Sequence, residues 1–406
     1  MRQIAEDKLL PTDIDAQPQV RAAAALRSVI RGYRDEIERE QRLPKTLVEQ
    51  FHAAGFYSLV MPRALGGLQA DPLTYVRVVE LLAEGAGSVG WNVANNSIGQ
   101  LVTLGLSDEG VDEIYARGAD TVIAGTAVMG GGRAVPVDGG YRVTGRWPFG
   151  TGCQESSWML GSFKILDGDQ PRRSPDGSSV YWRGIFRRSE AQIVEGSWDV
   201  SGMRATGSFD WTVDDVFLPE RRTMVHAGVP LDNQWKRWPG ISYALPAQAW
   251  VGPHHCAVIT GIARAGIDAL IELASAKTPR GRTGRLCENP QVQDAVGRAE
   301  AILNTGRAGR SAMITELWNT VAAGGETTLE QRARCRLAAV YAADCAREAM
   351  DLMYRQGGST SYRRESRLAE CWRDLHVVGQ AVTIAPEWYP IGGRALMKMD
   401  PGPRLR

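Results

Sequence analysis

The spacing of apolar residues divides the chain into helical, strand-like and again helical stretches. Residues 19–40 carry Ala, Leu, Val and Ile at intervals of three and four, which predicts one long amphipathic helix. A second helix is predicted to begin at Pro44 and to end at Gly55. Two further helical segments are expected across 72–104. Residues 1–119 are therefore predicted to form an N-terminal helical domain.

The pattern changes near residue 120. Short segments rich in Val, Tyr, Trp and Thr, such as GGYRVTGRW and SSWMLGSFKI, alternate with Gly, Pro and Asp clusters, which predicts a β-sandwich or β-barrel over 120–225. The remainder, 226–406, returns to Ala-rich helical periodicity and predicts a four-helix bundle. Its helices are expected at 254–276, 290–322, 328–355 and 366–384. The predicted fold class is α+β multidomain, with a helical, a β and a helical part in that order.

Composition excludes several classes of protein. The 406 residues include 47 Lys and Arg against 46 Asp and Glu, a net charge of +1 without a basic run, which argues against nucleic-acid binding. No apolar run has the length of a membrane span, and the charged N-terminus lacks a signal-peptide core. The six cysteines form no CxxC pair, so neither a zinc site nor a disulfide framework is predicted. A cytoplasmic protein without a metal is expected.

Two common active-site motifs are absent. Neither a P-loop nor a GxSxG nucleophile motif occurs. The glycine-rich GGGRAVPVDGG at 130–140 precedes a strand, YRVTG, and no helix follows it, so it does not match a dinucleotide fingerprint. Tight turns between strands are the better interpretation of these glycines.

The segment GRWPFGTGCQESSW at 145–158 is a candidate ligand site. Its aromatic residues Trp147 and Phe149 can cover a flat ligand, and the small residues Thr151 and Gly152 permit close approach of the backbone. An ordinary aromatic-rich strand is an equally good interpretation of the same residues.

The histidines offer a second candidate. His376, in ECWRDLHVVGQ, falls at the edge of an apolar helical stripe, one turn beyond Trp372, where its ring can reach a cavity. A structural histidine fits that position as well. His254 and His255 open the first bundle helix, and because adjacent residues point about 100° apart, at most one of them can face a given cavity.

Four segments, in order, resemble the acyl-CoA dehydrogenase fold family along nearly the whole chain. They are PKTLVEQFHAAGFYSLVMPRALGG, GGYRVTGRWPFGTGCQESSW, GMRATGSFDWTVDDVFLPE and GIARAGIDALIELASAK. The resemblance implies an N-terminal helical domain, a central β domain and a C-terminal bundle that bind flavin. Alignment on Gly145 places Phe149 and Thr151 where the family has the Trp and Thr that pack on the flavin ring and hydrogen-bond to it.

The departures from the dehydrogenases are informative. Their catalytic Tyr-Glu-Gly-Thr motif is missing after Arg373–Asp374, and only Glu387 offers a displaced carboxylate. RDLH at 373–376 instead resembles the two-component (group D) flavin-dependent monooxygenases of the same fold, a branch that includes p-hydroxyphenylacetate hydroxylase and dibenzothiophene monooxygenase. That resemblance implies that Arg373 contacts the cofactor and that His376 holds a C4a-(hydro)peroxide of the flavin, since an imidazole titrates near neutral pH.

The segment GSVGWNVANNSIGQ at 87–100 is expected to face the substrate. Several phenol hydroxylases of this branch carry a histidine where the chain has Asn96, next to Asn95. Asparagine can orient a polar group but cannot act as a base at neutral pH. Trp91, Asn95 and Asn96 are the predicted substrate contacts, with helix surface or capping as the alternative for the two asparagines.

The predicted function is a two-component flavin-dependent monooxygenase. The resemblance implies reduced FMN or FAD delivered by a separate flavin reductase, with O2 and a small aromatic, polyketide-like or heteroatom-bearing substrate, in a homotetramer. Two alternatives stay open. One is a dehydrogenase or oxidase that uses a displaced base such as Glu387, and the other is a flavin-free member of the family that only binds a ligand.

Overall fold

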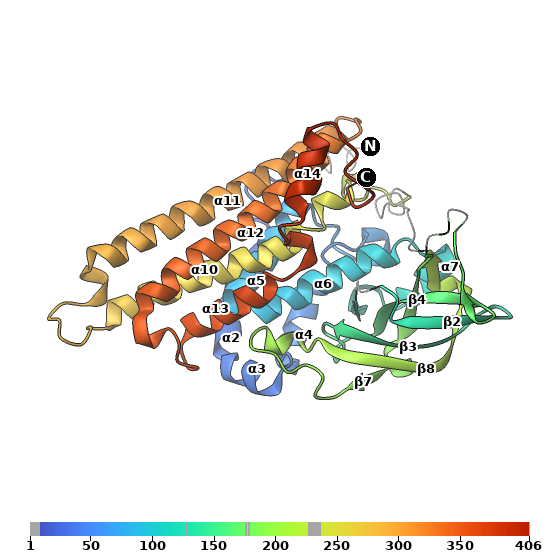
Figure 1. Ribbon diagram of the computed structural model, residues 1–406, viewed down its shortest axis with the longest axis horizontal. Helices are drawn as coiled ribbons and strands as arrows, with labels where there is room; N and C mark the ends of the chain where they lie inside the picture. The colour runs from blue at the N-terminus through green and yellow to red at the C-terminus, as the bar shows by residue number, and fades with distance from the viewer. Residues whose placement is uncertain (1–8, 127–128, 175–176, 178, 226–236, 406) are drawn as a thin grey trace.

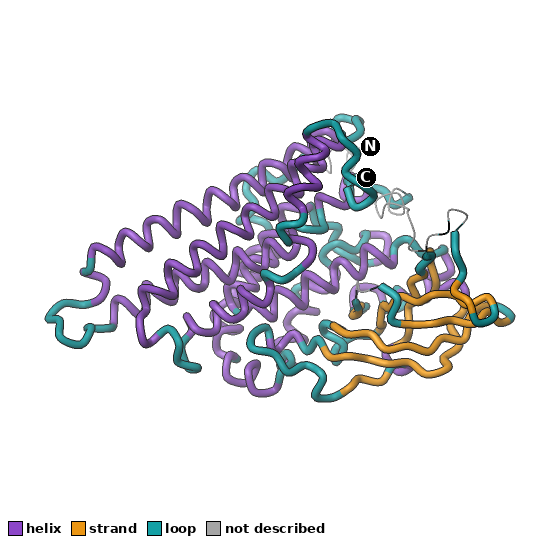
Figure 2. The backbone as a smooth tube through the Cα atoms, in the orientation of Figure 1, coloured by secondary structure: helices purple, strands orange, loops and turns teal. Residues whose placement is uncertain are grey.

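The chain folds as helices, then a sheet, then helices (Figure 1). The computed structural model describes residues 9–126, 129–174, 177, 179–225 and 237–405. The strands gather at one end of the molecule and the long C-terminal helices extend from the other (Figure 2). The predicted fold class is thus confirmed, whereas the proposed domain boundaries at 119/120 and 225/226 stay predictions.

The N-terminal helices differ from the prediction in one place. They are α2 (Pro18–Gly32), α3 (Arg34–Glu40), α4 (Lys45–Ala53), α5 (Pro72–Gly85), α6 (Gly87–Thr103) and α7 (Asp108–Ile114). The single helix expected over 19–40 is wrong, because the chain breaks at Tyr33, with φ −89° and ψ 5°. Directly after the break, Arg34 pairs with the buried Glu370 and donates to the carbonyl oxygen of Glu365 at 2.9 Å. These contacts cross more than 300 residues and leave no trace in local periodicity.

Helix α5 shows how local sequence starts an element that packing then buries. Asp71 caps it by accepting hydrogen bonds from the backbone N–H groups of Leu73 and Thr74, at 2.9 and 3.0 Å, and Pro72 occupies the first helical position. Nearly every face of α5 is buried, since it packs against α2 on one side and α10 (Pro253–Ala276) on the other. One hydrophobic core therefore joins the N-terminal helices to the C-terminal ones.

The strands form one mixed sheet in the order β7-β8-β3-β2-β4-β6-β9, with β1 and β5 paired to β4. They are β1 (Ile123–Gly125), β2 (Gly132–Val137), β3 (Gly140–Gly150), β4 (Trp158–Asp167), β5 (Gln170–Pro171), β6 (Trp182–Arg187), β7 (Gln192–Val194), β8 (Phe209–Pro219) and β9 (Thr223–Val225). β1 and β2 run parallel to β4, and the other pairs are antiparallel. A tight turn at Gly139, with φ +73°, joins β2 to β3, as the glycine pattern predicted.

The C-terminal helices include α10, α11 (Pro290–Ala322), α12 (Leu329–Gly357), α13 (Arg367–Val378), and the shorter α9 (Ile241–Ala244) and α14 (Trp388–Leu396). Small residues let them approach closely: a Cβ added at Gly261 would lie 2.4 Å from the carbonyl oxygen of Glu80 on α5. Helix α13 stops at Val378, earlier than the predicted end at 384, and a short 3₁₀ turn, η10 (Val382–Ile384), follows it. None of the helices in the described ranges is both long and apolar enough to cross a membrane.

Candidate active site

A bulge at the end of β3 separates the two aromatic residues of the predicted ligand strand. The pairing of β3 with β8 shifts between Trp147 and Gly150, and Phe149 adopts φ +63°, a costly conformation for a bulky residue. Alternate residues of a regular strand share a face, so the bulge is what sends these two side chains to different environments. Phe149 is 51% exposed, whereas Trp147 is fully buried.

Trp147 belongs to the core of the sheet. Its indole N–H donates to the carbonyl oxygen of Ser162 at 2.7 Å, and its ring stacks on Trp211 with centroids 4.3 Å apart. Trp147 has no exposed surface, and this burial contradicts the prediction that it contacts the cofactor. The aromatic side chain that can meet a ligand here is Phe149, whose ring also packs edge-on against Trp198 at 6.2 Å.

A chain of buried hydroxyl groups starts beside Phe149. The indole N–H of Trp91, on α6, lies 3.3 Å from Thr151 Oγ1, which hydrogen-bonds to Ser208 Oγ at 2.8 Å. Ser208 donates in turn to Thr206 Oγ1 at 2.8 Å, and Thr206 donates to the carbonyl oxygen of Met203 at 2.9 Å. The three hydroxyl side chains are almost completely buried, so this series holds Thr151 in one orientation.

The Arg-Asp pair of α13 anchors the far end of that chain. Asp374 Oδ1 accepts from the backbone N–H of Met203 at 2.6 Å, and the backbone at Gly202 lies directly against Arg373. Burial, and next the neighbouring charge of Glu370, raises the pKa of Asp374 well above its ordinary value. The partly buried Arg373 forms no hydrogen bond or ion pair within the described ranges, so its cofactor contact stays a prediction.

Two histidines extend the site next to Trp91. The rings of Trp91 and His255 stack with centroids 4.0 Å apart and planes 4° apart, and the ring of His254 is tilted by 33° against that of His255, with centroids 3.7 Å apart. His255 Nδ1 hydrogen-bonds to Thr383 Oγ1 at 2.7 Å, while its buried Nε2 has no partner among the described residues. Burial, followed by the charges of His254 and Arg336, holds the pKa of His255 well below its usual range, so the ring is neutral. We call Trp91, Thr151, Ser208 and His255 the Trp91 cluster.

His255 could not be singled out from the sequence, where helix geometry implies only that at most one of His254 and His255 faces a given cavity. The usable signal was two adjacent polar rings in the first turn of a helix whose following residues are mostly apolar and buried.

His376 lies apart from the Trp91 cluster. On a helix, residues two positions apart point about 200° apart, so Asp374 and His376 face nearly opposite directions. His376 Nε2 lies 3.4 Å from Asp351 Oδ1 on α12, and its ring is 4.3 Å from that of Trp372. Among the described contacts of His376, none reaches Trp91 or Thr151. The structure therefore does not join the predicted catalytic residue to this cluster.

Of the two asparagines predicted to contact substrate, Asn96 has a structural role. Its Nδ2 donates to the carbonyl oxygen of Tyr57 at 2.9 Å, and its Oδ1 accepts from the N–H of Ile123 at 2.8 Å. Both polar ends of the buried amide are thus occupied by backbone, which contradicts a substrate contact. Asn95 is only partly buried and donates to the carbonyl oxygen of Trp91 at 3.0 Å, so its role stays a prediction.

Gly152 permits close packing behind Thr151. It has φ +67°, and an added Cβ would lie 2.7 Å from Asn92 Oδ1 on α6. The cavity between these residues has a volume of about 10 Å³, roughly enough for one water molecule. Gly152 therefore brings the turn after β3 against α6 rather than opening space for a ligand at this point.

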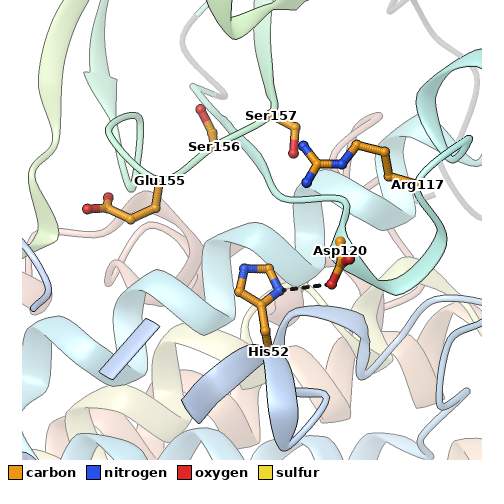
Figure 3. A pocket seen from close by; sticks show the side chains of 6 residues that line it. All are labelled: His52, Arg117, Asp120, Glu155, Ser156 and Ser157. Atoms are coloured by element: carbon orange, nitrogen blue, oxygen red, sulfur yellow. Dashed lines mark ion pairs between the residues drawn. The ribbon is translucent and has the colours of Figure 1, made fainter. Parts of the chain in front are cut away.

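A separate polar pocket opens between α4 and the start of β4 (Figure 3). Its volume is about 330 Å³, and its lining consists of His52, Arg117, Asp120, Glu155, Ser156 and Ser157. His52 Nδ1 lies 3.7 Å from Asp120 Oδ1, and burial raises the pKa of Glu155 to about 7. A lining of charged and polar side chains suits a flat apolar ring poorly. The Trp91 cluster is the better candidate site for such a ligand.

The residues around Phe149 fit a flavin. Its exposed ring offers an apolar face, and the oriented hydroxyl of Thr151 lies two residues further along the same strand end. An isoalloxazine presents the matching combination of a flat aromatic system and a polar edge. The cofactor would therefore be held by Phe149 and Thr151 on the sheet side.

Comparison with known proteins supports this interpretation. The models of the acyl-CoA dehydrogenase N-terminal and C-terminal domains match residues 15–113 and 254–385. An indole-3-acetate monooxygenase of Pseudomonas putida is 31% identical over 385 residues, which cover 93% of this chain and 95% of the relative. The chain belongs to the acyl-CoA dehydrogenase fold family. Within that family it is a flavin-dependent monooxygenase.

The monooxygenase HsaA is similar to this chain both in sequence and in structure. The oxygenase subunit HsaA of a flavin-dependent monooxygenase from Mycobacterium tuberculosis is 28% identical, and the match covers 96% of this chain and 97% of HsaA. The crystal structure of the HsaA monooxygenase has a TM-score of 0.85, with 97% of this chain and 100% of that chain covered at 26% identity. The cofactor of this monooxygenase is reduced flavin; a relative from Rhizobium is named as the oxygenase component of an FADH2-dependent resorcinol hydroxylase, and solved structures of two other relatives hold FADH2 or FMN.

Proposed function

We propose that this monooxygenase hydroxylates a small aromatic substrate beside the Trp91 cluster. The overall reaction balances as RH + O2 + reduced flavin giving ROH + H2O + oxidised flavin. The observation that carries the proposal is the juxtaposition of the oriented Thr151 hydroxyl with the stacked rings of Trp91 and His255. The names of relatives agree with it, since they act on indole-3-acetate and resorcinol.

Each residue of the site has a distinct task in this proposal. Bound reduced flavin supplies the two electrons that activate O2. Phe149 supports the flavin ring, and Thr151, held by Ser208 and Thr206, presents a fixed hydroxyl to its polar edge. The face of the Trp91 ring that is turned away from His255 offers a flat surface against which an aromatic substrate can stack, and the stacking on His255 holds that ring in place. Burial of the cluster excludes water, which limits unproductive release of hydrogen peroxide.

The test follows oxygen atoms from 18O2 into the product. The purified chain is mixed with reduced FMN or FADH2 made by a reductase behind a dialysis membrane, together with indole, indole-3-acetate or resorcinol. We expect one 18O atom in a hydroxylated product, and faster turnover for Trp91→Phe than for Trp91→Ala because only phenylalanine keeps a stacking ring. Product that draws its oxygen from water, or oxidation of none of the three compounds, would refute the proposal.

The catalytic role of His376 stays part of the proposal, although its support is the sequence resemblance alone. Its neighbour Asp351 can accept a hydrogen bond from the imidazole and so fix its orientation. The His376→Asn variant tests the role, with the fraction of consumed O2 that appears in product as the readout. A large fall in that fraction supports His376, whereas an unchanged fraction removes it from the reaction.

A homotetramer in the cytoplasm completes the proposal. Large apolar side chains stand exposed on α12, on α14 and after it, namely Tyr341, Leu396, Met397 and Met399, and such a surface suits burial between subunits. All six cysteines are free thiols, as a reducing compartment requires. Light scattering coupled to size-exclusion chromatography tests the assembly, and cell fractionation tests the location.

A further inference from the structure

Arg336 on α12 is a buried cation without a counter-ion. The residue is 3% exposed, and its one hydrogen bond within the described ranges runs from NH1 to the carbonyl oxygen of Thr383, at 2.9 Å. Its Nε is buried and has no partner, and no carboxylate of the described residues pairs with it. Burial above all, with a smaller contribution from the charge of Arg404, lowers the pKa of Arg336 to about 9. An uncompensated buried charge is strongly unfavourable in a folded protein.

The fold pairs comparable arginines with acids. Arg310 is equally buried but lies 3.7 Å from Glu80, and the buried Arg222 pairs with Glu113 and with Glu190 at 3.2 Å. Arg336 instead meets the ring of Trp388, 4.1 Å away, which Arg404 contacts at 4.4 Å. Cation–π contact offsets only part of the cost of burying a charge. None of the described residues therefore supplies a negative group beside Arg336.

The unpartnered Nε2 of His255 provides a second, independent observation. Arg336 and His255 both contact Thr383, the former at its carbonyl oxygen and the latter at its hydroxyl. If the hydroxyl of Thr383 donates to Nδ1, then Nε2 carries the hydrogen and is a donor without an acceptor. In that tautomer both vacant donors lie around one residue, Thr383. That residue belongs to η10 and is itself only partly buried.

We propose that the substrate is an aromatic acid whose carboxylate binds between Arg336 and His255 while its ring stacks at the Trp91 cluster. This inference rests on the proposed function, because it assumes that the Trp91 cluster is the substrate site. One negative charge balances one guanidinium, and carboxylate oxygens accept hydrogen bonds from both donors. His255 stacks on Trp91 and shares Thr383 with Arg336, which connects the proposed carboxylate site to the Trp91 cluster.

The experiment compares an acid with its neutral isostere. Dissociation constants for indole-3-acetate and indole-3-acetamide are measured by calorimetry on the flavin-loaded full chain, and kcat/KM is measured for both. We expect the wild type to bind the acid at least about ten-fold more tightly than the amide, since a charge-assisted pair outweighs a neutral hydrogen bond. Equal affinity for the two compounds would overturn the proposal without the need for any variant.

Variants locate the preference. In Arg336→Gln the acid is expected to lose its advantage while the amide binds as before. Arg334→Gln is the matched control, because Arg334 lies on the same helix, is exposed and pairs with Glu330 at 2.6 Å. Thermal unfolding and flavin binding verify that Arg336→Gln is folded, and Arg336→Lys, which keeps the charge, should retain part of the preference. Retention of the full preference in a folded Arg336→Gln would also overturn the proposal.

The two proposals fail in different ways. Hydroxylation of indole or resorcinol without any preference for the acid would leave the monooxygenase function intact and remove the carboxylate site. Tight, Arg336-dependent binding of the acid without hydroxylation of any aromatic compound would keep the carboxylate site and remove the proposed hydroxylation.

Discussion

Replacing Thr151 by valine removes one buried hydroxyl and almost no volume. The hydroxyl makes two hydrogen bonds, with Trp91 Nε1 at 3.3 Å and with Ser208 Oγ at 2.8 Å. Ser208 keeps its own bond to Thr206, so the indole N–H is the group left without a partner. At about 1 kcal/mol per buried hydrogen bond, discounted because Trp91 is only partly buried, Thr151→Val should lower the free energy of unfolding by about 1–2 kcal/mol.

Equilibrium urea unfolding of the Thr151→Val variant, followed by tryptophan fluorescence, measures that change. Thr151→Ser retains the hydroxyl and is the matched control. Once the loss of the methyl group is allowed for, its free energy of unfolding should lie within about 0.5 kcal/mol of the wild-type value. Valine should also divert O2 from product to hydrogen peroxide, because the hydroxyl facing the flavin is gone. If valine is as stable and as well coupled as the wild type, or if serine is equally impaired, the hydroxyl chain does not have the role assigned to it.

Three further outcomes are expected. Asn96→Ala should cost about 2 kcal/mol in urea unfolding, because the N–H of Ile123 loses its acceptor, whereas Asn95→Ala should stay within about 0.5 kcal/mol; equal effects would contradict the structural assignment. Trp147→Ala should cost about 3–5 kcal/mol, while Phe149→Ala should leave stability nearly unchanged and weaken flavin binding in fluorescence titrations. Because the pKa of Asp374 is raised, the folded state keeps the proton of this carboxyl to higher pH than the unfolded state does, so stability should fall as pH rises from about 4 toward neutrality. In thermal melts, Asp374→Asn should make stability depend less on pH over this range. An unchanged pH dependence in this variant would assign the effect to another group.

Local sequence encoded the elements because each depends on nearby residues. Apolar periodicity and prolines placed α5, α6 and the long C-terminal helices, and a glycine able to adopt positive φ placed the turn at Gly139. The break at Tyr33 and the early end of α13 escaped prediction because packing against distant segments decides them. The two parallel strand pairs were not predicted for the same reason, because the alternation of apolar and polar residues within a strand does not specify which strand it pairs with.

The candidate site, like the fold, could be predicted from local sequence only in part. The sequence by itself determined that an aromatic and hydroxyl-bearing strand end, an Arg-Asp helix and a polar start of the first bundle helix exist. Only the tertiary structure decided that the bulge exposes Phe149 and buries Trp147, and that backbone groups occupy Asn96. It also decided that Arg336 and His255, 81 residues apart by their numbering, both contact Thr383. The type of a residue determines which chemistry its side chain can perform. Where that chemistry can occur depends on which side chains are buried and which of their polar atoms lack a hydrogen-bond partner. Both properties arise from contacts between segments that are distant in the chain.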